Sequence, residues 1–274
     1  NDMICAGVNS AINELRGSFC GFVYDINKNE IEAFSNHSGE RALYYFADGA
    51  LLIVANHMKI MHEALVANGI NPEPNIRGCY EMLATGSLLH GNTIIKNVYR
   101  ITAGKKLCCR NGRISIETYH RFTNIPEHKM TLDECIDCAD NLFRRAVDRI
   151  FKKNLEYGYQ AEADLSGGLD SRLVTWVAHD LGYKDILNVC YCQKGKIDHI
   201  TSKRIAKYLH NEYFFYPMNG GDFLLDVDEV NQKTGGGVVY CLCSGANRVF
   251  DLIDTNKIGL SVTGLLGEIH NAYW

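Results

Sequence analysis

The sequence predicts two domains of different fold class: an antiparallel, β-rich α+β domain, followed by an α/β domain built on a parallel sheet. Short β-type runs with tight-turn signals fill the first half, whereas strand and helix patterns alternate in the second half. The 274 residues, 46% of them hydrophobic, are enough for two cores. The pattern changes at Asn124-Ile125-Pro126-Glu127, so we place the domains at residues 1–125 and 126–274.

The first domain is expected to open with four short strands, at residues 18–25, 30–36, 42–47 and 50–56. Turn-forming residues separate them: Asn27-Lys28-Asn29, Ser38-Gly39 and Asp48-Gly49. Helices are expected at 57–68 and 77–84, and further strands at 97–104, 105–110 and 113–122. Consecutive strands with such short turns favour an antiparallel arrangement.

The second domain is expected to start with a long helix. Thr131 and Glu134 form a capping-box pattern, and the helical pattern reaches Lys153. Strands are then expected at 159–165, 186–192, 212–218 and 257–264, with helices at 171–181 and 199–210 between the first three. This alternation predicts a parallel sheet with crossover helices.

Charge and hydropathy exclude two classes of partner. The net charge is −4, which gives no general attraction to nucleic acid or to an anionic membrane. The basic pairs Arg144-Arg145 and Lys152-Lys153 lie on a predicted helix and are typical of a solvated face. The sequence has no apolar run near the ~18 residues that span a bilayer, and its first residues do not resemble a signal peptide.

Eleven cysteines are many for a chain of this size, but their spacing is not that of a disulfide framework. Cys135 and Cys138 are a C-x-x-C pair within a predicted helix, and Cys190 and Cys192 share a predicted strand. A zinc site is conceivable from such spacings. Buried thiols in a reducing cytosol are the interpretation we prefer, so we expect a cytoplasmic protein without zinc.

The stretch Ser-Gly-Gly-Leu-Asp-Ser at 166–171 lies where a predicted strand meets a predicted helix. A helix N-terminus has unpaired N–H groups and a partial positive charge, and therefore attracts anions. Gly167 and Gly168 would let a phosphate approach the backbone, while Ser166 and Ser171 supply hydroxyl groups. Asp170 fits as an N-terminal cap, or as a holder of Mg²⁺ or an amine.

Other nucleotide motifs do not fit this stretch. The P-loop needs a lysine at the helix start, and no G-x-G-x-x-G follows the strand. Residue types alone leave two interpretations open: a phosphate site, or a glycine turn with a serine cap and no ligand.

Family resemblance favours the phosphate site. DLSGGLDSR at 164–172 resembles the signature of the ATP-pyrophosphatase (PP-loop) enzymes, which cleave ATP between the α and β phosphates, and within them it is most similar to the asparagine synthetase family. Residues 17–46 and 91–122 resemble two segments of that family's glutaminase domain. SVTGLLGEIHNAYW at 261–274 resembles its S/T-G-x-G-x-D-E-x-F-G-G-Y segment.

The resemblance implies a glutaminase-like domain of the N-terminal-nucleophile type, lacking its front part, and then a PP-loop synthetase domain lacking its C-terminal part. It implies ATP and Mg²⁺, a small carboxylate or amino-acid substrate, ammonia or glutamine as nitrogen source, and a possible homodimer. The residues implied in binding ATP and pyrophosphate are Leu165, Ser166, Gly167, Gly168, Leu169, Asp170, Ser171, Val189, Cys190, Gly264 and Gly267. Asp170 and Glu268 would be catalytic and would hold Mg²⁺.

Several residues depart from the family pattern. The family's glutaminase needs a cysteine as its first residue, whereas this chain begins with Asn1 and its Cys5 is internal, so we expect no N-terminal nucleophile in this chain. Ser35-Asn36 replaces Arg-Asp, Asn56-His57 replaces Ser-Glu, and Leu265-Leu266 interrupts the second glycine-rich segment. A degenerate binding or assembly module therefore remains an alternative, and a third is a PP-loop enzyme with another acceptor, such as a nucleotide or tRNA base. Arg172 suggests a divergent branch.

Overall fold

The computed structural model describes residues 8–49, 51–123, 129–235 and 240–264. The chain divides into two compact units. Unit 1 comprises Asn1–Ile125 and Gln232–Gly237, and unit 2 comprises Pro126–Asn231 and Val238–Trp274. Unit 1 contains antiparallel sheets and unit 2 a parallel sheet, which confirms the predicted combination of sheet types. No helix among the described residues is long and apolar enough to cross a membrane.

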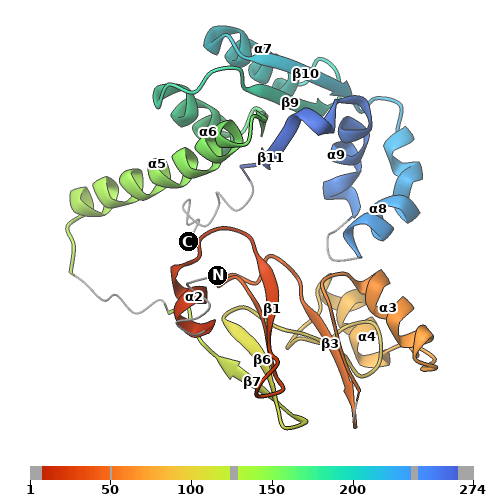
Figure 1. The fold of residues 1–274 in the computed structure, drawn as a ribbon. Coiled ribbons are helices and arrows are strands. Elements are labelled where there is room, and N and C mark those ends of the chain that lie inside the picture. Colours follow the sequence, from red (N-terminus) through yellow and green to blue (C-terminus); the bar gives the residue numbers. More distant parts are fainter. Residues whose placement is uncertain (1–7, 50, 124–128, 236–239, 265–274) are drawn as a thin grey trace. The chain divides into compact units, whose positions relative to one another are not determined.

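Unit 1 contains two antiparallel sheets, with strand orders β1-β2-β6-β7 and β4-β3-β5 (Figure 1). The strands are β1 (Cys20–Asp25), β2 (Glu30–Ser35), β3 (Tyr44–Asp48), β4 (Leu51–Ala55), β5 (Val98–Arg100), β6 (Lys105–Arg110) and β7 (Arg113–Thr118). The helices are α2 (Val8–Glu14), α3 (Met58–Ala67) and α4 (Ile76–Thr85). Every strand and helix predicted for this part is present, although β5 is shorter than the predicted run at 97–104.

Two hydrophobic clusters form the core of unit 1. One contains Ala33 of β2 and Leu107 of β6, together with Tyr45 of β3 and Val54 of β4, so the two sheets pack face to face. The other lies on the opposite face of β3 and packs that sheet against α3. The unit is therefore layered as sheet, sheet and helix.

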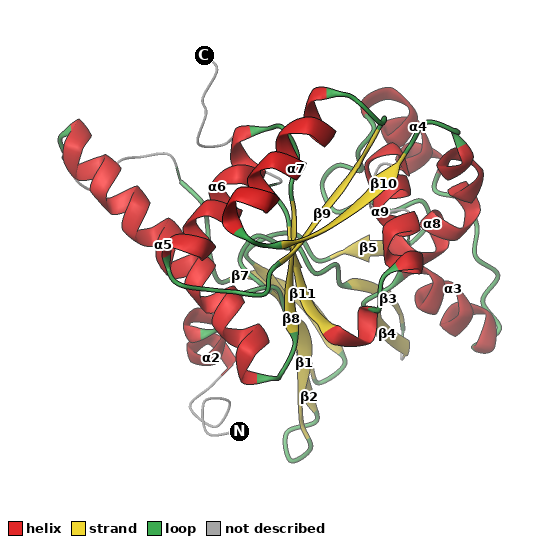
Figure 2. Cartoon of the chain, turned by 90° about the horizontal axis from the view of Figure 1, so that it is seen from above, coloured by secondary structure: helices red, strands yellow, loops and turns green. Residues whose placement is uncertain are grey.

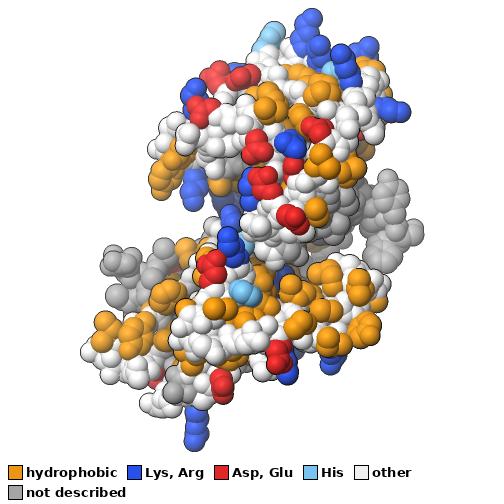
Figure 3. Space-filling view, turned by 90° about the vertical axis from the view of Figure 1, so that its right-hand side faces the viewer, with side chains coloured by type: hydrophobic (Ala, Val, Ile, Leu, Met, Phe, Trp, Pro, Cys, Tyr) orange, Lys and Arg blue, Asp and Glu red, His pale blue; other side chains and the backbone are white. Residues whose placement is uncertain are grey.

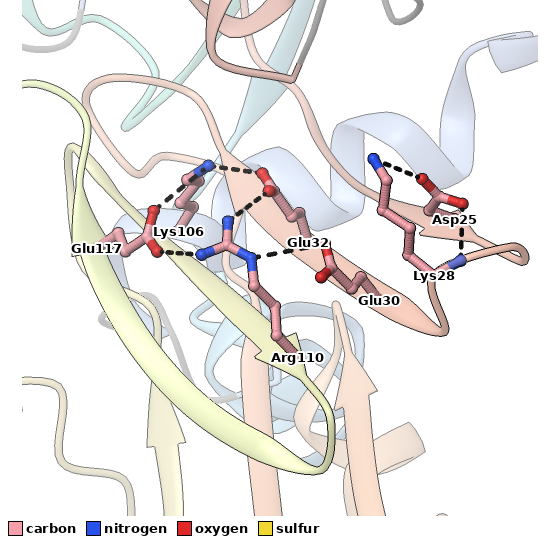
Figure 4. A network of polar contacts seen from close by, with 7 residues as sticks. All are labelled: Asp25, Lys28, Glu30, Glu32, Lys106, Arg110 and Glu117. Carbon is pink, nitrogen blue, oxygen red and sulfur yellow. Dashed lines mark hydrogen bonds and ion pairs between the residues drawn. The ribbon is translucent and has the colours of Figure 1, made fainter.

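A network of ion pairs lies on the four-stranded sheet of unit 1 (Figure 4). At its centre is Lys106, which is only 2% exposed. Its Nζ lies 2.5 Å from Glu32 and 3.6 Å from Glu117. Arg110 donates to the second oxygen of each of these carboxylates, in both cases at 3.0 Å. The buried ammonium group is thus paired on both sides, as a buried charge requires.

Helix α4 packs through a glycine. A side chain at Gly78 would lie 2.4 Å from the carbonyl oxygen of Thr93, so only glycine allows this approach. Ile76, Tyr80 and Leu83 of the same helix are exposed. Figure 3 shows hydrophobic side chains gathered on the part of unit 1 that carries α3 and α4.

Unit 2 contains a four-stranded parallel sheet of order β10-β9-β8-β11 (Figure 2). Its strands are β8 (Gln160–Asp164), β9 (Leu187–Cys192), β10 (Glu212–Pro217) and β11 (Ile258–Val262). The helices are α5 (Leu132–Glu156), α6 (Leu169–Asp180), α7 (Ile197–Leu209), α8 (Val227–Thr234) and α9 (Tyr240–Leu252), with short 3-10 helices at Asp222–Asp226 and Thr255–Lys257. All the predicted strands and helices are present, and α5 begins with the predicted capping box.

Helices cover both faces of this sheet. Ala161 and Ala163 of β8 pack against Phe151 of α5 and Val177 of α6. On the other face, strands β9 and β10 pack against Val249 of α9. Both faces of a parallel sheet are normally covered in this way.

A buried polar cluster connects the sheet to α6. The Asn188 amide group, on β9, donates to the carbonyl oxygen of Ala163 at 3.2 Å and to the hydroxyl group of Thr175 at 3.1 Å. The amide of Asn211, just before β10, donates to the Asn188 side-chain oxygen at 2.8 Å. Asn188 and Thr175 are fully buried, and these hydrogen bonds supply the partners that buried polar groups need.

Candidate functional site

The strand order of unit 2 places β8 beside β11, and the candidate site lies at the carboxyl ends of these two strands. The connections from β8 lead to β9 and β10 on one side, while β11 joins the sheet on the other side of β8. In open parallel sheets, ligands bind outside the carboxyl ends of the strands where the order changes direction in this way. The residues after β8 are Leu165 to Gly168, and those after β11 are Thr263 and Gly264.

The loop after β8 is held by its own serines. The Ser166 N–H donates to the Ser171 hydroxyl at 3.0 Å, and the Gly168 N–H donates to the Ser166 hydroxyl at 3.1 Å. The two hydroxyl oxygens lie 3.0 Å apart. The Leu165 N–H donates to the Val189 carbonyl oxygen at 2.7 Å, which fixes the loop to β9.

Helix α6 begins two residues earlier than predicted, at Leu169, and its N-cap is Gly168. The predicted capping role of Asp170 is therefore wrong, since Asp170 lies within the first turn and the N-cap makes no side-chain hydrogen bond. The reason is that Gly168 has the extended φ and ψ angles of an N-cap, −71° and 158°. A carboxylate in the first helical turn is still favoured by the helix dipole.

The loop after β11 approaches the start of α6 closely. A Cβ atom on Gly264 would lie 2.5 Å from the Ser171 backbone nitrogen, so only glycine fits at this position. The structure thus brings Gly264 together with Asp170 and Ser171. The predicted residues Gly267 and Glu268 lie outside the described residues.

Val189 and Cys190 are buried, at 2% and 3% exposure, so their side chains are not available to a ligand. The binding role that the resemblance implies for them would therefore have to involve backbone groups. The Cys190 sulfur lies 3.9 Å from that of Cys192. Among the described residues, no group of three or more His, Cys, Asp or Glu side chains could hold a metal ion.

Strand β8 carries two acids, Glu162 and Asp164, that the sequence analysis missed. Glu162 and Asp164 lie on the face of β8 opposite its buried alanines. Burial first, and then the Asp164 charge, raise the pKa of Glu162 to about 8, against a smaller lowering effect of the Ser261 hydroxyl. Burial also raises the pKa of Asp164 to about 6, although the Tyr191 hydroxyl donates to it at 3.3 Å. The signal was in the sequence, since Glu-Ala-Asp interrupts a strand that should be apolar on both faces.

A third missed residue is Asp198, in the first turn of α7. Its Oδ1 accepts a hydrogen bond from the Gly167 N–H at 2.7 Å. No local pattern indicates this contact, because the two residues are separated by all of α6 and β9.

Residues 3–120 match the family of glutamine amidotransferase domains. Two curated relatives, the amidase chry2 of Gibberella zeae and the amidase chyE of Penicillium rubens, are 26% and 27% identical over 176 residues, or 63% of this chain. The chain spans about a quarter of the length of these relatives, 25% in each case.

Two solved structures are similar at low TM-scores. The NH3-dependent NAD synthetase of Campylobacter jejuni has a TM-score of 0.31 and 17% identity, covering 44% of this chain and 54% of that protein chain. The glutamine-dependent NAD+ synthetase of Acinetobacter baumannii has a TM-score of 0.35 and 13% identity, covering 98% and 64%. At these scores the similarity carries no conclusion about fold or activity. The family match shows that residues 3–120, less than half of the chain, are similar to glutamine amidotransferase domains.

Proposed function

We propose that this chain is part of an ATP-dependent amidotransferase similar to the asparagine synthetases. The observation that carries the proposal is the position of the Ser-Gly-Gly loop, which follows β8 where the strand order changes direction and lies against Gly264. The glutamine amidotransferase match over residues 3–120 supports glutamine or ammonia as the nitrogen source.

The residues at this place suit the phosphates of ATP. The Ser166 and Ser171 hydroxyl groups lie together, and the first turn of α6 adds the partial positive charge of a helix N-terminus. Gly264 has no side chain and lies close to the Ser171 backbone, so the backbone of both loops can approach a bound phosphate closely. The proposed Mg²⁺ ligands are Asp170 and Glu268, of which Glu268 lies outside the described residues.

In the proposed reaction, a carboxylate oxygen of the substrate attacks the α-phosphorus of ATP. The bond to the β-phosphate breaks, giving an acyl-adenylate and pyrophosphate. Ammonia then attacks the acyl carbon, AMP leaves, and an amide remains. The role of the loop is to orient the phosphates and to stabilise the negative charge that develops on the leaving pyrophosphate.

The test uses the full-length protein with MgATP, an ammonium salt and a panel of carboxylic acids that includes aspartate. We expect acid-dependent release of pyrophosphate. Asp170→Asn should lower kcat/KM by about 100-fold, as for the loss of one charge-stabilising group. Asp185→Asn is the matched control, because Asp185 is exposed with a φ of 57°, which asparagine adopts readily. Release that no acid stimulates, or that Asp170→Asn leaves unchanged, would contradict the proposal.

A second candidate is amide hydrolysis, which the names of the two curated relatives favour. Hydrolysis of an amide needs no ATP. Release of ammonia from amides in the absence of ATP, without pyrophosphate formation, would therefore support the second candidate over the first.

A further inference from the structure

Asp198 extends from a well-fixed helix start. The ring of its neighbour His199 stacks on Phe215, with ring centres 4.0 Å apart and an interplanar angle of 16°. His199 Nδ1 also accepts the Gly195 N–H at 3.1 Å, which closes the turn before α7. Asp198 is therefore held by contacts that do not involve the loop after β8, and its carboxylate is directed at that loop through the Gly167 N–H.

The contact with Asp198 explains why glycine is at position 167. A Cβ atom on Gly167 would lie 2.9 Å from the Asp198 Oδ1 atom and 3.3 Å from its Cα atom. The space of the missing side chain is thus filled by Asp198. Gly168 differs, since a Cβ there would meet only the Ser166 hydroxyl oxygen, at 3.2 Å.

Three consecutive N–H groups of the loop already have side-chain acceptors. Ser171 accepts from Ser166, Asp198 from Gly167, and Ser166 from Gly168. The two serines belong to the Ser-Gly-Gly-Leu-Asp-Ser stretch itself. Of the three acceptors, Asp198 alone comes from another helix and carries a carboxylate, and hydrogen bonds to charged groups are the stronger kind.

We propose that Asp198 is a positioning residue of the nucleotide site, acting through Gly167 to fix the Ser-Gly-Gly loop in the conformation that binds the phosphates. This inference rests on the proposed ATP site. The Asp198 carboxylate replaces water as the Gly167 acceptor, so the loop is ordered before a ligand arrives and the cost of ordering it on binding is reduced.

The first experiment compares two substitutions in the full-length protein by calorimetric titration with MgATP. Asp198→Ala should raise the Kd by roughly 10-fold or more, as for the loss of a hydrogen bond to a charged group. Asp198→Asn retains an acceptor oxygen, although a neutral and therefore weaker one, and should raise the Kd by only about three-fold. Asp133→Ala, which removes an exposed carboxylate from the first turn of α5, is the control and should bind as wild type.

Two results of this titration would overturn the inference. Unchanged affinity in Asp198→Ala would mean that the loop needs no external acceptor. Equal loss in Asp198→Ala and Asp198→Asn would mean that the charge acts directly and not through Gly167.

The second experiment is a double-mutant cycle that tests the assignment of the glycine. If Gly167 has no side chain because of Asp198, Gly167→Ala should weaken MgATP binding strongly in the wild type and at least about five-fold less in the Asp198→Ala background. An equal effect in both backgrounds would indicate that position 167 lacks a side chain to make room for the ligand and not for Asp198, and would contradict the proposal.

A third measurement separates the Asp198 contact from the ATP site. Amide hydrogen exchange at Gly167 is followed by mass spectrometry in the protein without nucleotide. Asp198→Ala should speed this exchange by roughly 10-fold or more, while Asp198→Asn should not. If the variants show this pattern but the wild-type protein does not bind MgATP, the proposed function is contradicted while the Asp198–Gly167 contact is supported. If exchange is unchanged in Asp198→Ala, the contact itself is contradicted.

Discussion

Glu162 is a single residue whose buried environment makes the stability of unit 2 depend on pH. It is 1% exposed, and neither carboxylate oxygen accepts a hydrogen bond of normal geometry from the described residues. Because its pKa is raised from 4.5 to about 8, the folded state holds the proton more tightly than the unfolded chain does. Its contribution to stability is therefore fully present below pH ~4.5, and is lost as the pH rises through about 8.

Glu162→Gln should accordingly stabilise unit 2 at pH 8 to 9, by an amount on the order of a few kcal/mol, because the neutral amide needs no protonation. At pH ~4.5 the gain should disappear. Urea unfolding from pH 4.5 to 9 measures the difference. Glu156→Gln, on an exposed side chain, is the control and should show no such dependence. A gain that is the same at all pH values would contradict the assignment.

The contacts of single residues were the part of the site that the sequence predicted least. Ser166 and Ser171 were expected in the loop because hydroxyl groups beside two glycines form a local pattern. Asp198 was missed because its partner Gly167 is 31 residues away. Glu162 was missed because polarity predicts exposure, and only the packed sheet shows that the carboxyl group is buried.

At the scale of elements, α5 depends on its cap more than a packed helix would. Leu132, Ile136 and Leu142 of its first half are exposed, whereas the buried residues Val147, Phe151 and Asn154 all lie in its second half. The first turns therefore gain little from packing. Their order depends on the capping box, in which the Thr131 hydroxyl accepts the Glu134 N–H at 3.3 Å and Glu134 accepts the Thr131 N–H at 2.8 Å.

Thr131→Ala should therefore fray the start of α5 without lowering the melting temperature of the core. Loss of an N-cap costs about 1 kcal/mol, which corresponds to roughly five-fold faster amide exchange over residues 132–142. Hydrogen exchange read by mass spectrometry measures this, with Glu134→Gln as the conservative variant that should retain most of the protection. Equal exchange in Thr131→Ala and wild type would show that other contacts order these turns.

Elements with a strong local signal were predicted well. The capping box at Thr131 and the apolar alternation of the strands located most of the helices and strands. Ends were less accurate: β5 stops at Arg100, because the next N–H, that of Ile101, leaves the sheet ladder to bond Leu43. The start of α6 was misplaced because a glycine, rather than a polar side chain, serves as its N-cap.

At the scale of the whole molecule, each unit has its own hydrophobic clusters. Leu107 lies in a cluster formed only by residues of unit 1, and Phe151 in one formed only by residues of unit 2. A domain with its own core is able to unfold cooperatively by itself.

Leu107→Ala should thus lower the melting temperature of unit 1, and Phe151→Ala that of unit 2. The two side chains are 0% and 1% exposed, and such truncations cost about 2–5 kcal/mol. Scanning calorimetry measures the transitions, and proteolysis with mass spectrometry assigns each to its unit. A single transition lowered by both variants would show that the units unfold together.

The strand order was not predictable from the sequence. Alternation of strands and helices predicts a parallel sheet, but it does not determine on which side of β8 a late strand such as β11 is added. That position depends on packing: β11 contributes Val262 to the cluster under α5 and α6, and the Asn154 side chain accepts the Leu260 N–H at 2.9 Å.

The buried cluster of Thr175, Asn188 and Asn211 has a consequence for how this sequence can vary over evolution. If Asn188 alone became leucine, the Asn211 amide and the Thr175 hydroxyl would lose the partner that they have inside the unit. A substitution at one of the three positions therefore requires compensating substitutions at the others. Lineages can replace the cluster by an apolar one only through joint substitution, so these positions should covary across related sequences although they are far apart along the chain.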